Sequence, residues 1–201
     1  MARPEIPEPN EENINACWNE WKDDEKNIAQ EKVLHFLFKE QCPENAEIED
    51  ILLKVTVLND FYKVNVDRHS DLYTVSEHIE GCKEIDEKLC SGDLDLVNEI
   101  ARVTVDEKMG KTINFYSFAS KYCSHHEPEV YPIYDRHVDE MLWYFKKRDK
   151  FSGFKRYELK EYKKFSKIVH AFKRHYGLKS CLRKIDIYLW LTGKKFFDPQ
   201  E

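Results

Sequence analysis

The chain has 201 residues, enough for one domain of ordinary size, with 35% charged and 41% hydrophobic residues. Six glycines and seven prolines are too few for a turn-rich β architecture or for long disordered stretches. No run of about 18 apolar residues exists, which excludes a membrane-spanning helix. The first residues lack the apolar stretch of a secretory signal, so we expect a cytoplasmic protein.

Apolar residues recur at steps of three and four along most of the chain, and this spacing predicts helices. Residues 1–10 contain three prolines and are predicted to form an extended arm. One or two helices follow over 11–41 and stop before Pro43. Residues 48–62 have a clean apolar helical face, which absorbs the β-branched run at 55–57.

The helical pattern continues through the middle of the chain. A short helix is predicted over 72–79, then a turn and cap at Ser91-Gly92-Asp93. Apolar residues predict further helices over 94–101 and over about 112–124.

A proline-bearing link separates this part from the last helices. Pro128 and Pro132 break the preceding helix and predict extended backbone over 128–134. Asp135 then opens a helix, and two more helices follow through residue 189. Because no segment shows the alternation typical of a strand, the predicted fold class is all-α, a compact globule of about eight or more short helices.

Charge is distributed unevenly along the chain, whose formal net charge is −6. Residues 1–140 contain 15 Lys+Arg against 32 Asp+Glu, whereas residues 141–201 contain 17 against 6. We predict a single domain over 11–201, acidic through residue 140 and basic and aromatic-rich over 141–195. The basic residues could attract phosphates while neighbouring aromatic rings stack on bases; alternatively, the two halves pair with each other or the cations are solvated. The candidate DNA-binding cations are Lys146, Lys147, Arg148, Lys155, Arg156, Lys163, Lys164, Lys173 and Arg174.

The six cysteines include no Cys-x-x-Cys pair, and we expect buried thiols rather than disulfides. The grouping Cys123-Ser-His125-His126 is the nearest approach to a metal cluster, but it lacks a second pair at the spacing of a zinc finger. We therefore expect no metal, and no nucleotide or dinucleotide signature predicts a cofactor.

Residues 111–143 combine a helix, a proline-bearing link and an Asp that starts a new helix. The segments Phe118-Ala-Ser-Lys121 and Tyr131-Pro-Ile-Tyr-Asp135-Arg-His-Val138, with Pro128 between them, resemble the corresponding stretch of the helix-hairpin-helix DNA glycosylase superfamily, its 8-oxoguanine glycosylase branch in particular. Residues 58–62 and 185–193 look like pieces of small bacterial proteins of that fold. The resemblance implies a DNA glycosylase-like fold and a DNA substrate with a damaged or modified base.

Two departures bear on the activity that the resemblance implies. The family grips DNA with a Gly-x-Gly hairpin, whereas residues 106–112 contain only Gly110. Bifunctional members carry a nucleophilic Lys before the Asp, but here Lys111 stands too early and Lys121 too late. Because the nucleophilic Lys has no counterpart here, the resemblance implies a monofunctional enzyme, which releases the base without cleaving the strand. Its catalytic candidates are Asp135 and, as the nearest lysine, Lys121.

A carboxylate suits this chemistry because positive charge builds on the sugar as the base departs. The simpler interpretation of Asp135 is a helix N-cap, which is compatible with catalysis, and that of Lys121 is a surface lysine. The base must leave the stack and enter a pocket, for which we name five candidate lining residues. They are Tyr131, Tyr134, Trp143, His126 and His137, and the histidines are also explained as polar residues near a turn.

Two functions from different classes follow. The first is a DNA-binding, glycosylase-like protein that excises a damaged or modified base through Asp135. The second is a non-enzymatic helical module that binds a protein or nucleic acid with its acidic front and basic back. Neither function requires a membrane.

Overall fold

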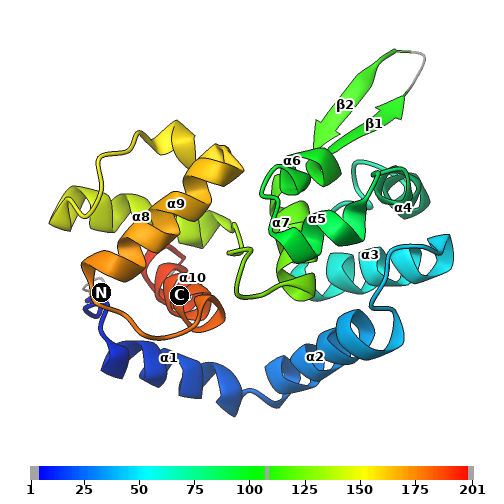
Figure 1. The fold of residues 1–201 in the computed structure, drawn as a ribbon. Coiled ribbons are helices and arrows are strands. Elements are labelled where there is room, and N and C mark those ends of the chain that lie inside the picture. Colours follow the sequence, from blue (N-terminus) through cyan, green and yellow to red (C-terminus); the bar gives the residue numbers. More distant parts are fainter. Residues whose placement is uncertain (1–4, 107–108, 199–201) are drawn as a thin grey trace. The chain divides into compact units, whose positions relative to one another are not determined.

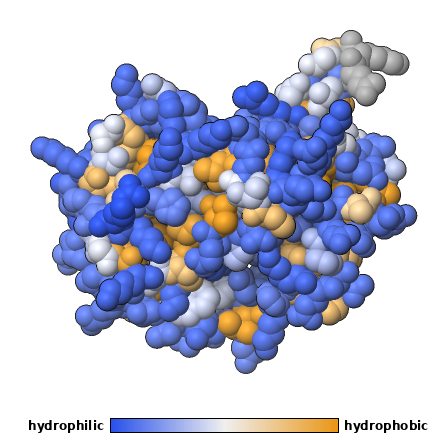
Figure 2. Space-filling model, viewed as in Figure 1, coloured by the Kyte–Doolittle hydropathy of each residue, from blue (hydrophilic) through white to orange (hydrophobic). Residues whose placement is uncertain are grey.

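The computed structural model describes residues 5–106 and 109–198, and about two thirds of the chain is helical. This confirms the all-α prediction (Figure 1). None of the helices in the described ranges is long and apolar enough to cross a membrane. The face seen in Figure 2 is mostly hydrophilic, in keeping with the mean hydropathy of −0.71. The elements in order are α1 (Glu11–Asp23), α2 (Glu25–His35), the π-helical turn η1 (Phe36–Gln41), α3 (Ile48–Tyr62), α4 (Leu72–Glu80), α5 (Ile85–Ser91), α6 (Leu96–Ala101), β1 (Arg102–Asp106), β2 (Lys111–Asn114), α7 (Tyr116–His126), α8 (Arg136–Asp149), the 3-10 helix η2 (Arg156–Lys160), α9 (Tyr162–His175) and α10 (Leu182–Phe197).

The chain divides into two compact units. Unit 1 comprises residues 1–28 and 132–201, and unit 2 comprises residues 29–131. Compactness does not show that either unit folds alone, so the single domain over 11–201 stays a prediction.

Unit 1 is built around α10, which packs against α8 and α1. Its core is aromatic: the ring centroids of Phe145 and Phe172 lie 5.4 Å apart, and those of Phe145 and Tyr188 lie 6.5 Å apart. A Cβ at Gly193 would come within 2.9 Å of the His137 Cβ. The absent side chain thus allows α8 and α10 to approach closely.

Unit 2 is organised around α3 and α7. Helix α3 packs against α4 and α7, and α7 also packs against α6 and η1. Ile51, Val55 and Leu58 of α3 are fully buried, which confirms the predicted apolar face. Because each helix buries only one stripe of side chains, these mutual contacts supply the hydrophobic core.

A β-hairpin corrects two predictions made from the sequence. Strands β1 and β2 pair antiparallel with Val103 opposite Ile113, whereas a helix had been expected from about residue 112 and no strand at all. Helix α7 instead begins at Tyr116. Each strand has five residues or fewer, which is too short for an alternation of apolar and polar residues to be recognised. The side of the hairpin that is buried is determined by contacts of β1 with α4 and α6.

Other local predictions are confirmed in part. Two helices and a π-helical turn fill 11–41, and the turn ends before Pro43. Gly92 has a φ of 73°, which a glycine adopts without strain, and the Asp93 side chain accepts a hydrogen bond of 3.0 Å from the Asp95 N–H, which confirms the turn. The predicted helix start at residue 94 is wrong, because α6 begins at Leu96 with Asp95 as its N-cap and without a side-chain cap bond. The extended backbone predicted over 128–134 is wrong for residues 128–130, which form a turn in which the Val130 N–H donates to the Glu127 carbonyl over 3.1 Å; residues 131–134 lie outside any helix or turn.

Candidate nucleic-acid interface

Asp135 is the N-cap of α8. Its backbone is extended, and its carboxylate accepts a hydrogen bond of 2.9 Å from the His137 N–H. The bond satisfies a donor at the helix start, where the helix dipole also favours an anion. Asp135 is half-buried, and its role as the N-cap confirms the prediction from the sequence.

A buried polar cluster holds the link to α8. The Tyr134 hydroxyl donates to Asp139 over 3.0 Å, and the Arg156 Nε donates to the other oxygen of the same carboxylate over 3.0 Å. The Tyr162 hydroxyl donates to the Pro132 carbonyl over 2.8 Å. Asp139 is only 4% exposed and was missed from the sequence, although it stands one helical turn after Asp135.

Three of the five base-pocket candidates lie in unit 1. Tyr134 is buried in the cluster just described. The buried imidazole of His137 has its Nδ1 3.6 Å from Glu140 and its Nε2 3.5 Å from Asp198. Trp143 is half-buried, and its ring packs against Phe154 at 6.0 Å between centroids.

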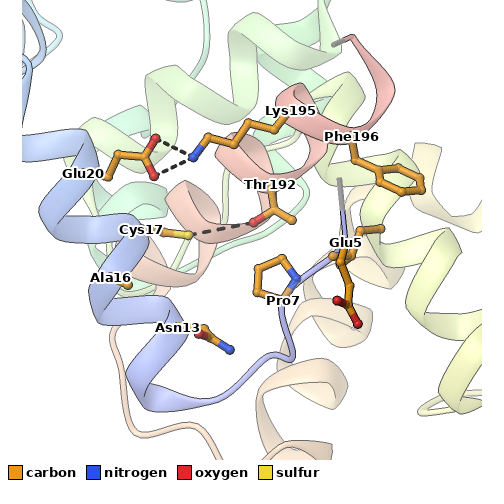
Figure 3. Close-up of a pocket in the computed structure, with 10 residues that line it drawn as sticks. Glu5, Pro7, Asn13, Ala16, Cys17, Glu20, Thr192, Lys195 and Phe196 are labelled. Carbon is orange, nitrogen blue, oxygen red and sulfur yellow. Dashed lines mark hydrogen bonds and ion pairs between the residues drawn. The ribbon is translucent and has the colours of Figure 1, made fainter. Parts of the chain in front are cut away.

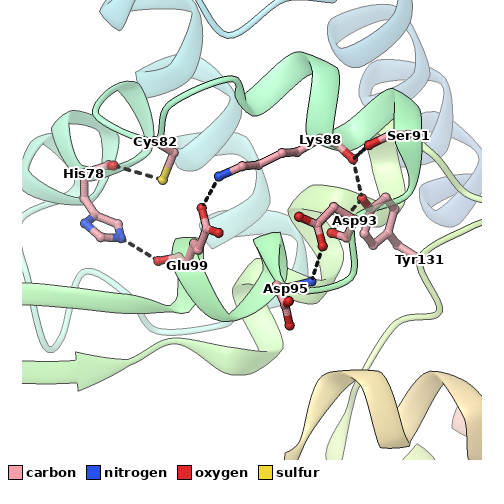
Figure 4. A network of polar contacts seen from close by, with 8 residues as sticks. All are labelled: His78, Cys82, Lys88, Ser91, Asp93, Asp95, Glu99 and Tyr131. Atoms are coloured by element: carbon pink, nitrogen blue, oxygen red, sulfur yellow. Dashed lines mark hydrogen bonds and ion pairs between the residues drawn. The ribbon is translucent and has the colours of Figure 1, made fainter.

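The other two candidates lie in unit 2. Tyr131 is fully buried, and its hydroxyl donates to the carbonyls of Lys88 and Asp93 over 3.1 and 3.2 Å (Figure 4). Burial raises the pKa of Tyr131, which keeps this hydroxyl a donor. His126 is also buried, and burial, helped by Lys54 and Lys39, holds its pKa well below the usual value. These contacts give both side chains structural roles, and their place in a base pocket stays a prediction.

Lys121 is not a surface lysine, so the simpler interpretation of this residue is wrong. The residue is 3% exposed on α7 in unit 2. Its ammonium group donates to the Ser117 hydroxyl over 2.7 Å and lies 5.3 Å from the centre of the Tyr62 ring. The inward face of α7 explains the burial, because Ser117 stands one turn before Lys121. The catalytic assignment of Lys121 stays a prediction.

All nine candidate DNA-binding cations belong to unit 1. Three of them have carboxylate partners there: Arg148 with Asp149 and Glu8, Arg156 with Asp139, and Lys164 with Glu158 and Glu161. Lys163 is exposed. Within the ranges that the structure describes, no carboxylate forms an ion pair with the side-chain cation of the remaining five, which are Lys146, Lys147, Lys155, Lys173 and Arg174. The backbone N–H of Lys155 does donate to the Glu158 carboxylate, over 2.7 Å.

Most of the interleaved aromatic rings are core rather than surface. Phe145 of α8, Phe172 of α9 and Phe151 are buried together, with the Phe151 and Phe172 centroids 5.5 Å apart. Other rings near the cations are exposed or half-buried, and two of them are Trp143 and Tyr157. Trp143 lies 4.8 Å from the Lys146 ammonium, and Tyr157 is 59% exposed. These two could stack on bases.

The cysteines and histidines form no metal site in the described part of the chain, where no group of three or more His, Cys, Asp or Glu is suitably placed. All six cysteines are free thiols, as expected, and Cys17, Cys42 and Cys123 are buried. The prediction of burial is wrong for Cys90, which is exposed, and for Cys82 and Cys181, which are half-buried. Burial raises the pKa of the Cys123 thiol, which keeps this thiol protonated.

Comparison with known proteins assigns more than half of the chain to a family. The family model HI_0787_N, described as an N-terminal domain, matches residues 13–130. The chain belongs to this family. An uncharacterized protein of Haemophilus influenzae is 45% identical over 150 residues, which cover 75% of this chain and 69% of the relative. No solved structure matches.

The matched family domain ends close to the division between the two units. It stops at residue 130, one residue before unit 2 ends, and it includes Lys121 and His126. Asp135 and the nine candidate cations lie beyond it. The family model therefore describes unit 2 together with α1, and the candidate interface belongs to the remainder of the chain.

Proposed function

We propose that this protein binds DNA through the cations of unit 1 and releases a damaged or modified base with Asp135 as the catalytic carboxylate. The observation that supports the proposal is the arrangement of α8. Asp135 caps its first turn, and Lys146 and Lys147 stand in its last turn without a described carboxylate partner. At 1.5 Å per residue, the eleven residues from Asp135 to Lys146 span about 16 Å, so one rigid helix carries both groups.

In this reaction the Asp135 carboxylate stabilises the positive charge that forms on the sugar. As the base leaves with the electrons of the glycosidic bond, C1′ becomes positive, and the Asp135 carboxylate offsets that charge. Water then bonds to C1′ and gives up a proton, while the departing base takes one. Because no lysine is assigned a bond to the sugar, the product is an intact abasic site.

The test is Asp135→Asn, which keeps an N-cap but removes the charge. We expect base release to fall by about 100-fold or more, with duplex binding changed less than twofold. The assay is a panel of oligonucleotides with single damaged bases, analysed with and without alkali. The matched control is Asp71→Asn, the same change at the N-cap of α4, where the side chain accepts a hydrogen bond of 3.0 Å from Tyr73.

Other outcomes would redirect the proposal. Strand nicking without alkali would contradict a monofunctional reaction, and Lys121 would then be the first lysine to replace. If Asp135→Asn and Asp71→Asn lower stability equally and wild type releases no base, Asp135 is only a helix cap.

The second candidate is a non-enzymatic interaction module. It is favoured by the acid–base pairs that already form inside unit 1, such as Glu8 with Arg148 and Glu20 with Lys195. The cap also gives Asp135 a sufficient structural role. Absence of base release from every lesion, together with retained DNA or protein binding, would favour this candidate.

A further inference from the structure

The N-terminal arm, residues 5–10, is an acidic strap on unit 1. It has neither helix nor strand, and buried side chains at Ile6 and Pro9 anchor it. The Tyr188 hydroxyl of α10 donates to the Pro7 carbonyl over 2.6 Å. Between these anchors the arm presents exposed carboxylates at Glu5 and Glu8.

Glu8 binds a cation predicted to contact DNA. Its carboxylate lies 2.6 Å from Arg148, whose Nε and terminal nitrogen also donate to Asp149 over 2.7 Å each. The Tyr176 hydroxyl donates to the same Asp149 side chain. One guanidinium thus faces two carboxylates, and the group has a net charge of −1. A phosphate that approaches Arg148 meets repulsion until Glu8 moves away.

The next acid occupies a second anion position. The Glu11 carboxylate, at the start of α1, accepts hydrogen bonds from the N–H groups of Lys179 and Ser180 over 2.5 and 3.0 Å and from the Ser180 hydroxyl over 2.8 Å. Bonds from Ser180 are the main cause of the lowered pKa of Glu11. Backbone N–H groups and hydroxyls are also what proteins offer to phosphate oxygens. This contact fixes the start of α1 to residues 179–180, which directly precede the N-cap of α10. Of the two acids, Glu8 is therefore the one that can move.

A cavity lies between the arm and the helices α1 and α10. Its volume is about 320 Å³, and the two helices supply its other walls (Figure 3). Pro7 and Glu5 line this cavity together with Cys17 of α1 and Thr192 of α10, and the Glu20–Lys195 ion pair joins these two helices. Empty space on this side lets the arm shift without compressing a packed core.

We infer that the arm is an autoinhibitory strap, in which Glu8 competes with the phosphates of DNA for Arg148. The inference rests on the proposed DNA binding. The pair is suited to competition because Glu8 is 65% exposed, although Arg148 is only 27% exposed, and water around an exposed carboxylate weakens its ion pair. A polyanion can displace the Glu8 carboxylate from Arg148. Because this displacement costs free energy, the protein binds the polyanion more weakly than it would without Glu8.

The test compares two single-charge changes in the full chain. Glu8→Gln opens the strap, and Glu12→Gln removes an exposed carboxylate that has no described contact with the basic residues. Binding of a duplex oligonucleotide and of heparin is measured from about 50 mM salt upward. We expect Glu8→Gln to tighten both by roughly two- to fivefold at low salt, with the gain fading as the charges are screened. Glu12→Gln should change binding less than half as much.

A double-mutant cycle separates the contact from net charge. In an Arg148→Gln background the effect of Glu8→Gln should disappear, because the strap has lost its partner. Equal effects of Glu8→Gln and Glu12→Gln, or an undiminished effect without Arg148, would overturn the strap. A Glu8-dependent gain for heparin without any duplex binding would retain the strap and overturn the proposed function. No binding of either polyanion to any variant would overturn both.

Discussion

The two units use charge in opposite ways. Unit 1 has 21 Lys+Arg and 17 Asp+Glu, a formal charge of +4, whereas unit 2 has 11 and 21, a charge of −10. The nine candidate cations of unit 1 are exposed or half-buried, but unit 2 places a lysine at the centre of its core. Charges at the surface remain available to a partner, while charges in the core serve the fold.

Besides Lys121, unit 2 buries Lys54, which is fully inaccessible to solvent. Its ammonium group donates to the carbonyls of Cys42 and Glu44 over 3.1 and 2.8 Å and to the Asn45 side chain over 2.7 Å. Asn45 in turn donates to Asp86 over 2.5 Å. Burial lowers the pKa of Lys54 to about 8, so the charge is costly and its hydrogen bonds offset that cost.

The largest expected effect contrasts one lysine from each unit. Lys54→Met keeps most of the volume but removes the ammonium donor from the Cys42 and Glu44 carbonyls, while the Asn45 Oδ1 keeps a bond of 2.5 Å from the Tyr122 hydroxyl. We expect a loss of about 3 kcal/mol in the free energy of unfolding. Lys195→Met removes an ion pair with Glu20 in which both side chains are about half exposed, and should lose less than about 1 kcal/mol. Urea unfolding of both variants measures the difference. Equal losses would remove the contrast between the units.

A smaller effect is expected on DNA binding. Reversing Lys146 and Lys147 together to Glu should weaken duplex binding by about tenfold or more near 50 mM salt and reduce the salt dependence, because two phosphate contacts are lost. The same reversal at the exposed Lys32 and Lys83 of unit 2 changes net charge equally. It should alter affinity less than twofold. Comparable losses from both pairs would show that net charge, not a site on unit 1, controls binding.

The smallest expected effect is on the free energy of unfolding at acidic pH. The pKa of His126 is lowered in the folded state, so below about pH 6.5 the unfolded chain binds a proton that the folded chain does not. Stability contributed by neutral His126 is therefore present above that pH and is lost as the pH falls.

Replacing this histidine tests the acid effect. His126→Phe should flatten the acid limb of a plot of unfolding free energy against pH, and His35→Phe, at an exposed histidine of α2, should not. An unchanged acid limb in His126→Phe would show that the imidazole is not held neutral by unit 2. Thermal unfolding in buffers from pH 7.5 to pH 5 gives the required curves.

The sequence predicted the features that depend on neighbouring residues. Helical spacing located the face of α3, and Pro128 and Pro132 located the link before α8. Asp135 was predicted as an N-cap because that role needs only the first turn of its own helix. The hairpin was missed because short strands gain their stability from packing rather than from their own residues.

The candidate site was only partly visible in the sequence. The basic segment was found by counting charges, but its neutralised members could not be distinguished from the free ones. Arg148 is paired with Glu8, which precedes it by 140 residues. Asp139 was missed because its partner Arg156 comes from another element.

Most of the helices, the N-cap at Asp135 and the concentration of positive charge over residues 141–201 can be predicted from local sequence. These features follow from periodicity, capping and composition, which act over a few residues. Only the tertiary structure decided that Lys121 and Lys54 are buried and that an acidic arm meets Arg148. Burial and long-range ion pairs depend on which helix faces pack together, and that choice is made by the whole core rather than by any local segment.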